Sequence, residues 1–276
     1  MPPKLGILAG SGDLPARIIQ ACRDGRRDFF VIAFEQQTDP DVVESTPHAW
    51  VRLGAAGTAL AELRKAGVEE LVMAGSIRRP SLAALRPDIW ATKVLAKAGI
   101  RARGDDGLLS FIVRELEASE GFRVVGPESI LPGILAEEGV LGSIRPDEIA
   151  LADIRQGIAV ARAIGALDVG QGAVVQQGMV LAVEAAEGTD AMLARCRGLA
   201  REGPGGILVK VRKPGQESRV DLPTIGVKTV KAAATAGLRG IAVEAGGALL
   251  VDRVGLIAAA DKAGVFVLGV ALPPVS

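Results

Sequence analysis

The densest group of chemically active side chains lies between Lys210 and Gly226. This segment holds four cations and an isolated aspartate, Asp221, and is predicted to join a strand to a helix. Cations such as Lys210 and Lys213 can neutralise a pyrophosphate, and a carboxylate among them can bind Mg²⁺ or position a water molecule. The alternative is a solvated charged loop in which Asp221 caps a turn. Composition favours neither interpretation over the other.

Further candidates stand where predicted strands end or helices begin. Thr224 offers a hydroxyl and Gly226 a backbone N–H at a predicted helix start, where an anion is favoured. Glu184 and Glu244 each end a predicted strand. We therefore regard these four residues as candidate binding residues.

Two glycine-containing loops could hold a phosphate group. Gly10-Ser11-Gly12 follows a predicted strand and precedes a helix, so its backbone N–H groups could point at an anion. Gly75 follows another strand, and Arg78 comes three residues later. Because strand carboxyl ends lie together in a doubly wound sheet, Arg78 could reach a phosphate held by the first loop. A solvated basic turn is the alternative for Arg78.

The first glycine loop also permits other interpretations. A dinucleotide fingerprint requires a third glycine, and Pro15 occupies that position. Glu35, at the end of the second predicted strand, could serve as the ribose-binding acid of an NAD-linked oxidoreductase. A tight turn without any ligand is a further possibility. Asp105 and Asp106 precede another helix, which one of them could cap, although paired aspartates can also hold Mg²⁺.

The overall composition excludes several classes of protein. Lys and Arg total 32 and so do Asp and Glu, which gives no global attraction to nucleic acid. Cys22 and Cys196 stand alone, which argues against a thiolate zinc site or a disulfide framework and fits a cytoplasmic protein. No apolar run is long enough to span a bilayer. His48 is the only histidine and has no evident nucleophile partner, so a Ser–His–Asp mechanism is not expected.

The alternation of short β-branched runs with helical patterns predicts an α/β protein of two domains. Residues 1–130 are predicted to form a Rossmann-like N-terminal domain with a parallel sheet. Residues 131–146 are rich in Pro and Gly and are predicted to be a linker. Residues 147–276 are predicted to form a distinct C-terminal α/β domain that carries Asp221.

The motifs together resemble a specific family, the LpxI-type UDP-2,3-diacylglucosamine pyrophosphatases, over nearly the whole chain. Each motif is modestly specific, and their order is highly specific. They are residues 6–15, 73–75 with 78–80, 104–109, 168–171, 180–184 with 187–190, 213–214, 221–226 and 240–246. One departure is Glu217-Ser218, where we expect Gln-Asp more often before the arginine.

The resemblance implies Mg²⁺-dependent cleavage of UDP-2,3-diacylglucosamine to 2,3-diacylglucosamine 1-phosphate (lipid X) and UMP. Water is expected to attack the sugar-side phosphorus, and Asp221 is the family residue carried over most firmly. The matching motifs add five positions to the candidate binding residues, namely Leu14, Pro15, Ala74, Gln171 and Ile225. We further expect a homodimer in peripheral contact with the cytoplasmic face of the bacterial inner membrane.

These observations combine into one hypothesis, in which both domains bind the ligand and close around it. Asp221 would bind Mg²⁺ or orient the attacking water, while Lys210, Lys213 and Arg78 would neutralise developing charge. The main alternative is a nucleotide-sugar-binding protein without chemistry. An NAD-linked oxidoreductase is disfavoured by Pro15, and a purely structural scaffold would leave the segment 210–226 without a purpose.

Overall fold

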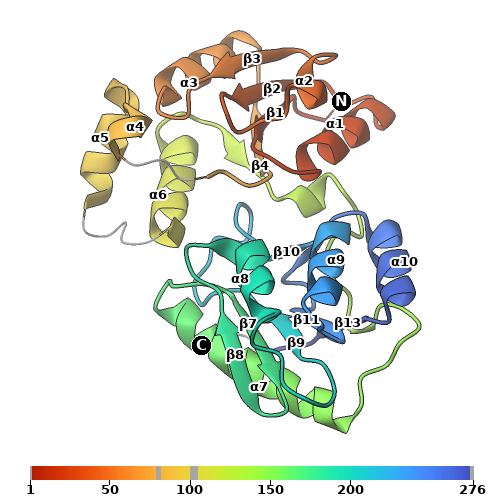
Figure 1. The fold of residues 1–276 in the computed structure, drawn as a ribbon. Coiled ribbons are helices and arrows are strands. Elements are labelled where there is room, and N and C mark those ends of the chain that lie inside the picture. Colours follow the sequence, from red (N-terminus) through yellow and green to blue (C-terminus); the bar gives the residue numbers. More distant parts are fainter. Residues whose placement is uncertain (1, 79–81, 100–104, 274–276) are drawn as a thin grey trace. The chain divides into compact units, whose positions relative to one another are not determined.

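The computed structural model describes residues 2–78, 82–99 and 105–273, which divide into two compact units (Figure 1). The first unit comprises Met1–Pro132 together with Glu217–Asp221, and the second comprises Gly133–Gln216 and Leu222–Ser276. Both units consist of sheets covered by helices, which confirms the predicted α/β class.

The first unit is built on a five-stranded sheet with the order β3-β2-β1-β4-β5, in which all neighbouring strands are parallel. The strands are β1 (Leu5–Ala9), β2 (Phe29–Phe34), β3 (His48–Val51), β4 (Glu70–Ala74) and β5 (Arg123–Val124). Strand order reverses between β1 and β4, and this reversal is the usual ligand-binding position of a doubly wound sheet. Both glycine loops follow the two strands at that position.

Helices cover the first sheet because its strands are apolar on both faces. They are α1 (Leu14–Asp24), α2 (Pro40–Val43), α3 (Ala56–Lys65), α4 (Leu82–Leu85), α5 (Ile89–Ala98), α6 (Asp105–Ala118) and the short 3₁₀ helix η2 (Pro127–Ser129). Leu63 of α3 and Val113 of α6 share one core with Ile32 of β2. Ile7 and Val31 point to the opposite face and are also fully buried.

The second unit contains a six-stranded mixed sheet with the order β6-β13-β11-β9-β7-β8. The strands are β6 (Gly139–Val140), β7 (Gly172–Gln176), β8 (Met179–Val183), β9 (Ile207–Lys210), β11 (Gly240–Glu244) and β13 (Phe266–Val270). The three central strands β13, β11 and β9 are parallel, whereas β6, β7 and β8 each pair antiparallel with a neighbour. Two short strands, β10 (Thr224–Ile225) and β12 (Leu249–Leu250), form a separate parallel pair.

Helix α7 (Glu148–Ala166) covers one face of the second sheet, where Ile154 packs with Ile207 and Phe266. The other face is covered by α8 (Gly188–Cys196), α9 (Val227–Thr235) and α10 (Arg253–Ala263), which share a core with Leu208 and Ile241. Asp147 begins α7, as its side chain accepts a hydrogen bond from Ala150 N at 2.7 Å.

The structure departs from the predicted domain organisation at two places. Where the sequence predicts a linker at 131–146, residues 139–140 form β6, which pairs with β13 inside the second sheet. Where the sequence predicts that the C-terminal domain carries Asp221, the five residues Glu217–Asp221 belong to the first unit. Among the helices of the described residues, none is long and apolar enough to cross a membrane.

Gly157 lets α7 lie close against the second sheet. A Cβ atom at this position would lie 2.4 Å from Cγ2 of Val209 on β9. We expect Gly157→Ala to lower the free energy of unfolding by about 1–2 kcal/mol, because the overpacking cost exceeds the gain in helix propensity. Chemical denaturation measures this change. Ala159→Ser, on the exposed side of the same helix, should stay within about 0.5 kcal/mol of the wild type. A Gly157→Ala protein as stable as the wild type would contradict the expected overpacking.

Candidate active site

Asp221 lies at the end of a short turn that packs on the first unit. Val220 packs against the core that α3 and α6 share with the sheet. The N–H groups of Val220 and Asp221 both donate to the Glu217 carbonyl, each at 3.2 Å. Asp221 is partly exposed. The turn therefore presents the Asp221 side chain from a backbone that is hydrogen-bonded to itself and held by an apolar anchor.

Arg219 fixes this turn to the free edge of the first sheet. Its Nη1 donates to Glu117 Oε1 at 2.7 Å and to the Val124 carbonyl at 3.3 Å. Glu117 Oε1 also accepts from the Val124 N–H at 3.2 Å. Val124 ends the edge strand β5, whose outer backbone groups have no neighbouring strand. Arg219 and Glu117 together satisfy both of these groups.

The parallel sheet places the two glycine loops next to each other, and the Asp221 turn lies beside its edge strand β5. Strands β1, β4 and β5 run in the same direction and end at Ala9, Ala74 and Val124. The carboxyl ends of β1 and β4 lie side by side, whereas Val124 pairs with Leu71, so that β5 ends three residues short of Ala74. The structure thus brings together the loop after β1 and the turn after β4. It places the turn that carries Asp221 in the same unit, beside the edge strand β5.

The two glycine loops bind each other through the backbone. Ser11 N donates to Ser76 O at 2.8 Å, and Ser76 N donates to Ser11 O at 3.0 Å. Gly10 N donates to Ala74 O at 2.7 Å. The expectation that the N–H groups of Gly10 and Ser11 point at a phosphate is therefore wrong in this conformation, because a backbone bridge already uses both donors.

The need for glycine in these loops follows from their close approach. A Cβ atom at Gly10 would lie 2.5 Å from Ser76 O, and one at Gly75 would lie 2.3 Å from Ser11 O. Gly75 also has a φ of +87°, which disfavours any side chain. Leu14 and Pro15 are buried in the packing of α1. These residues shape the loops, and Gly12 remains exposed at their tip.

Arg78 is the exposed cation of this edge. Its backbone is held by Gln37, whose Oε1 accepts from Arg78 N at 2.8 Å and whose Nε2 donates to Arg78 O at 3.3 Å. In the described part of the chain, the Arg78 guanidinium makes no hydrogen bond or ion pair. It is available to an anion. Arg79, Pro80 and Gly104 lie outside the described residues, as do the side chains of Asp105 and Asp106.

In the second unit, Lys210 is buried in a polar group at the carboxyl end of β9. Its Nζ donates to Thr189 Oγ1 at 2.6 Å and lies 3.7 Å from Glu184 Oε1. Thr189 Oγ1 in turn donates to Glu184 Oε1 at 2.6 Å. Lys210 is 4 % exposed and Glu184 is 7 % exposed. Lys210 is thus neutralised within the fold, which leaves it less charge to offer a phosphate than the sequence suggested.

Lys213 and Gln171 belong to a neighbouring polar group. Lys213 Nζ lies 2.7 Å from Asp168 Oδ1, and its backbone N–H donates to Gln216 Oε1 at 3.0 Å. Gln216 Nε2 donates to Gln171 Oε1 at 3.2 Å. Asp168 Oδ2 is buried and has no hydrogen-bond partner among the described residues. Asp168 received no role from the sequence, although it lies in one of the family motifs.

The remaining candidates have structural partners. Glu244 accepts from the backbone N–H and the guanidinium of Arg212 at 2.8–3.1 Å. Thr224 Oγ1 donates to Leu222 O at 3.1 Å, and Gly226 N donates to Thr229 Oγ1 at 3.3 Å. Ile225 is fully buried in the core below α9. The expectation that Gly226 offers a free N–H is therefore wrong, and Ile225 acts through packing.

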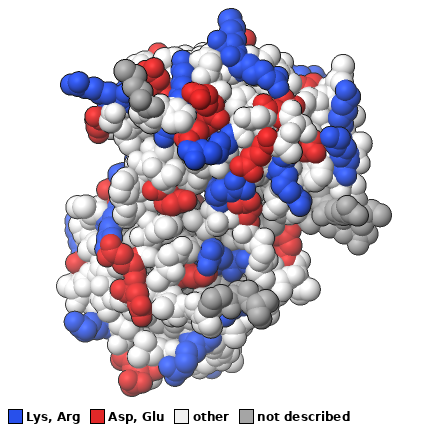
Figure 2. Space-filling model, turned by 180° about the vertical axis from the view of Figure 1, so that it is seen from behind, with Lys and Arg blue, Asp and Glu red and all other residues white. Residues whose placement is uncertain are grey.

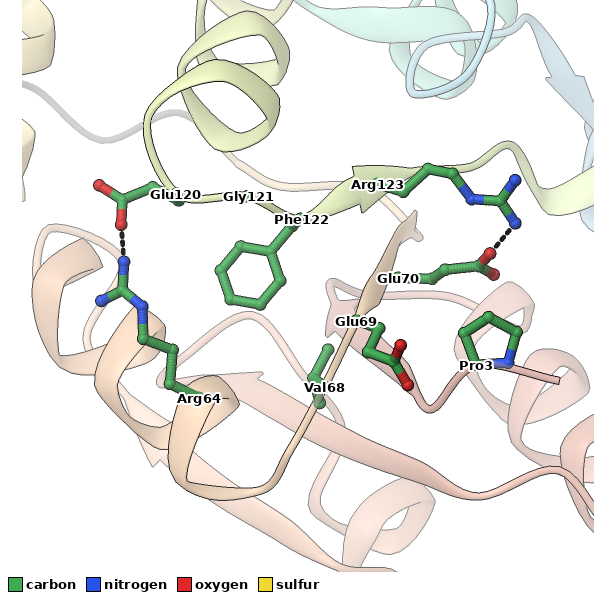
Figure 3. Close-up of a pocket in the computed structure, with 9 residues that line it drawn as sticks. All are labelled: Pro3, Arg64, Val68, Glu69, Glu70, Glu120, Gly121, Phe122 and Arg123. Carbon is green, nitrogen blue, oxygen red and sulfur yellow. Dashed lines mark hydrogen bonds and ion pairs between the residues drawn. The ribbon is translucent and has the colours of Figure 1, made fainter. Parts of the chain in front are cut away.

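A cavity of about 350 Å³ lies elsewhere in the first unit. It is lined by residues at the beginning of β4 and β5, including Glu70, Phe122 and Arg123. Figure 3 shows Phe122 between two ion pairs, Arg64 with Glu120 and Arg123 with Glu70. Because these are the amino ends of parallel strands, the cavity opens at the edge opposite the glycine loops. No candidate residue from the sequence lines it.

The described residues contain no group of three or more His, Cys, Asp or Glu side chains placed to hold a metal ion. Mg²⁺ commonly binds through one or two carboxylates, and water and substrate phosphates complete its shell. A partly exposed carboxylate such as Asp221 fits that mode of binding. Figure 2 shows cations and anions interspersed over the face drawn, as the balanced net charge leads one to expect.

Comparison with known proteins identifies the family. Residues 4–134 match the family model described as the LpxI N-terminal domain, and residues 137–268 match the LpxI C-terminal domain. The chain belongs to the LpxI family. Its LpxI relative from Caulobacter vibrioides, named UDP-2,3-diacylglucosamine pyrophosphatase LpxI, is 46 % identical over 274 residues and 97 % of each chain. The resemblance stated from the motifs is thereby confirmed.

Similarity to solved structures is weak by comparison. N5-carboxyaminoimidazole synthase from Aspergillus clavatus is 13 % identical with a TM-score of 0.26, over 67 % of this chain and 41 % of that one. The biotin carboxylase domain of 2-oxoglutarate carboxylase from Hydrogenobacter thermophilus is 12 % identical with a TM-score of 0.24, over 72 % and 40 %. Neither supports an inference about this LpxI chain.

The buried contact between Lys210 and Glu184 can be tested by a double-mutant cycle. Lys210→Met leaves the Glu184 carboxylate buried without its cation, so we expect a loss of about 3 kcal/mol in the free energy of unfolding. Adding Glu184→Gln removes the uncompensated charge and should restore more than half of that loss. Urea denaturation of the wild type, both single variants and the double variant measures the coupling. Strictly additive effects would show that the two side chains do not interact.

The contact with Arg219 should also affect the measured pKa of Glu217. The hydrogen bonds from its guanidinium hold the pKa of Glu217 below its ordinary value. A lowered folded-state pKa stabilises the fold above the unfolded pKa of about 4.3, and this stabilisation is lost as pH falls through the folded-state pKa. In Arg219→Met, carboxyl NMR should show the Glu217 pKa returning toward its ordinary value. The pKa of Glu187, lowered by Arg195, serves as control and should not move.

Proposed function

We propose that this LpxI-family chain hydrolyses the pyrophosphate of UDP-2,3-diacylglucosamine to 2,3-diacylglucosamine 1-phosphate and UMP. The observation that carries the proposal is the 46 % identity, over 97 % of both chains, to a protein named for that activity. The turn that holds Asp221 and the exposed Arg78 support it, because both belong to the first unit.

In the proposed reaction, water attacks the sugar-side phosphorus. A new P–O bond forms to the water oxygen while the bond from that phosphorus to the bridging oxygen breaks. UMP leaves with the bridging oxygen, and the water proton passes to solvent or to a nearby carboxylate. Asp221 orients the attacking water through its carboxylate, and Arg78 stabilises charge that develops on the phosphate oxygens.

Mg²⁺ is the proposed cofactor, with Asp221 as its protein ligand and phosphate oxygens of the substrate as further ligands. When bound, the ion draws negative charge from the pyrophosphate as a Lewis acid. Lys213 contributes positive charge in this proposal, although its ion pair with Asp168 reduces that contribution. Lys210 acts at a distance from the substrate by ordering the group around Glu184.

The proposed substrate carries two acyl chains, so the protein should work at a membrane surface. Leu167 and Val169 flank Asp168 and are 76 % and 45 % exposed. Exposed apolar side chains beside a polar group suit an amphiphilic ligand. We therefore propose peripheral contact with the cytoplasmic face of the inner membrane. A non-catalytic nucleotide-sugar-binding protein is the alternative, and formation of UMP separates the two.

The first experiment incubates the protein with UDP-2,3-diacylglucosamine and Mg²⁺ in ¹⁸O-labelled water. Mass spectrometry should find UMP and 2,3-diacylglucosamine 1-phosphate, with the label in the phosphate of the latter. Label in UMP would show attack on the other phosphorus. Binding without either product would favour the alternative function.

Asp221→Ala should lower kcat at least about 100-fold, because water orientation and metal binding act in the transition state. KM should change much less, since other residues bind the substrate. Steady-state kinetics with wild type and variant at equal folded concentration measures both. Ser218→Ala, an exposed change in the same turn, is the matched control. A folded Asp221→Ala protein with normal kcat would remove Asp221 from the mechanism.

Chelation tests the requirement for Mg²⁺ independently of the Asp221 variant. Treatment with EDTA followed by removal of the chelator should abolish turnover, and added Mg²⁺ should restore it. Full activity after chelation would exclude a required Mg²⁺ while leaving the hydrolase assignment in place.

A further inference from the structure

We propose that Arg219 is the positioning residue for Asp221 and that Glu117 of α6 is its partner in this role. The inference rests on the proposed function of Asp221 and adds to it two residues that do not touch the reacting atoms. Arg219 holds the turn Glu217–Asp221 on the edge of β5, and this attachment determines where the Asp221 carboxylate lies.

The contacts of Arg219 join the turn to two elements of the first unit that lie 95 and 102 residues earlier in the chain. Its Nη1 reaches Glu117 of α6 and the backbone of β5, while its Nε and Nη2 each donate to Glu217 at 2.9 Å. Glu117 is itself fixed by the Val124 N–H. The guanidinium therefore connects the turn to a helix and to a strand end at the same time.

The chain around this turn makes such an attachment necessary. Residues Gly133–Gln216 and Leu222–Ser276 belong to the second unit, so only the five residues between them join the first. Val220 contributes an apolar contact with the first core, but one side chain does not define an orientation. The planar guanidinium, with donors in fixed directions, does define one.

The carboxylates around Arg219 argue that its guanidinium does not bind the substrate phosphate. Two carboxylates, Glu117 and Glu217, share the single positive charge of its guanidinium. The group of three side chains therefore carries a net negative charge, which would repel a pyrophosphate. The exposed Arg78 has no such partners among the described residues. The role left for Arg219 is to set the position of the neighbouring carboxylate.

Geometry at a reacting centre is demanding, because a displacement of about 1 Å can reduce turnover about 100-fold. We expect Arg219→Met to lower kcat by 10- to 100-fold, while KM stays within about threefold of the wild type. Arg219→Lys should recover part of kcat, since an ammonium can replace some but not all of the donors. Glu117→Gln should fall between the wild type and Arg219→Met.

The decisive measurement combines Arg219→Met with Asp221→Asn, assayed by product formed over long incubations. If Arg219 acts through Asp221, the double variant should be no slower than Asp221→Asn alone. A general structural role would slow it by the full additional factor. Ser218→Ala in the same turn and Arg195→Met, which breaks an exposed ion pair with Glu187 in the second unit, should leave kcat unchanged.

The outcomes separate the two proposals. Normal kcat in a folded Arg219→Met protein, or fully additive loss in the double variant, would overturn the positioning role alone. Normal kcat in Asp221→Ala would instead overturn the role of Asp221 on which it rests. If Arg219→Met does not fold, Arg219→Lys and Glu117→Gln give the same test, with reduced kcat at unchanged thermal stability as the expected result.

Discussion

The hydrogen bonds between Arg219, Glu117 and Val124 are the constraint on which the proposed site depends. Strand β5 is the edge of a parallel sheet, and an edge leaves backbone N–H and C=O groups without partners. Here Arg219 and Glu117, from distant parts of the chain, satisfy the C=O and N–H groups of Val124, the last residue of the strand. The same contacts bring Asp221 into the first unit, so protection of the edge and placement of the carboxylate have one physical cause.

The two units use their charged residues differently. In the second unit, Lys210, Arg212 and Lys213 each have a carboxylate or hydroxyl partner, and Lys210 is buried. Buried charges require such compensation, because desolvation is costly. In the first unit, Arg78 is exposed and Asp221 is partly exposed. Groups that remain open to solvent are the ones able to meet an anionic ligand.

In the two glycine loops, the glycines are explained by packing and not by ligand binding. Gly10 and Gly75 are required because the two loops touch through their backbones, with no space for a Cβ atom. The bridge between Ser11 and Ser76 then uses the donors that a phosphate would need. Family membership and the position of the loops support their place in the site, but their role is to bring β1 and β4 together at the strand reversal.

The sequence alone determined the α/β class and the family, because these depend on local periodicity, turn residues and the order of motifs. It also singled out Asp221 and Arg78. The tertiary structure decided which unit holds Asp221, and it showed that Glu117, 102 residues before Arg219, is its partner. No local pattern encodes such a contact. The burial of Lys210 and the lost donors of Gly10 and Gly226 were equally invisible, because burial and backbone pairing arise only when distant segments pack together.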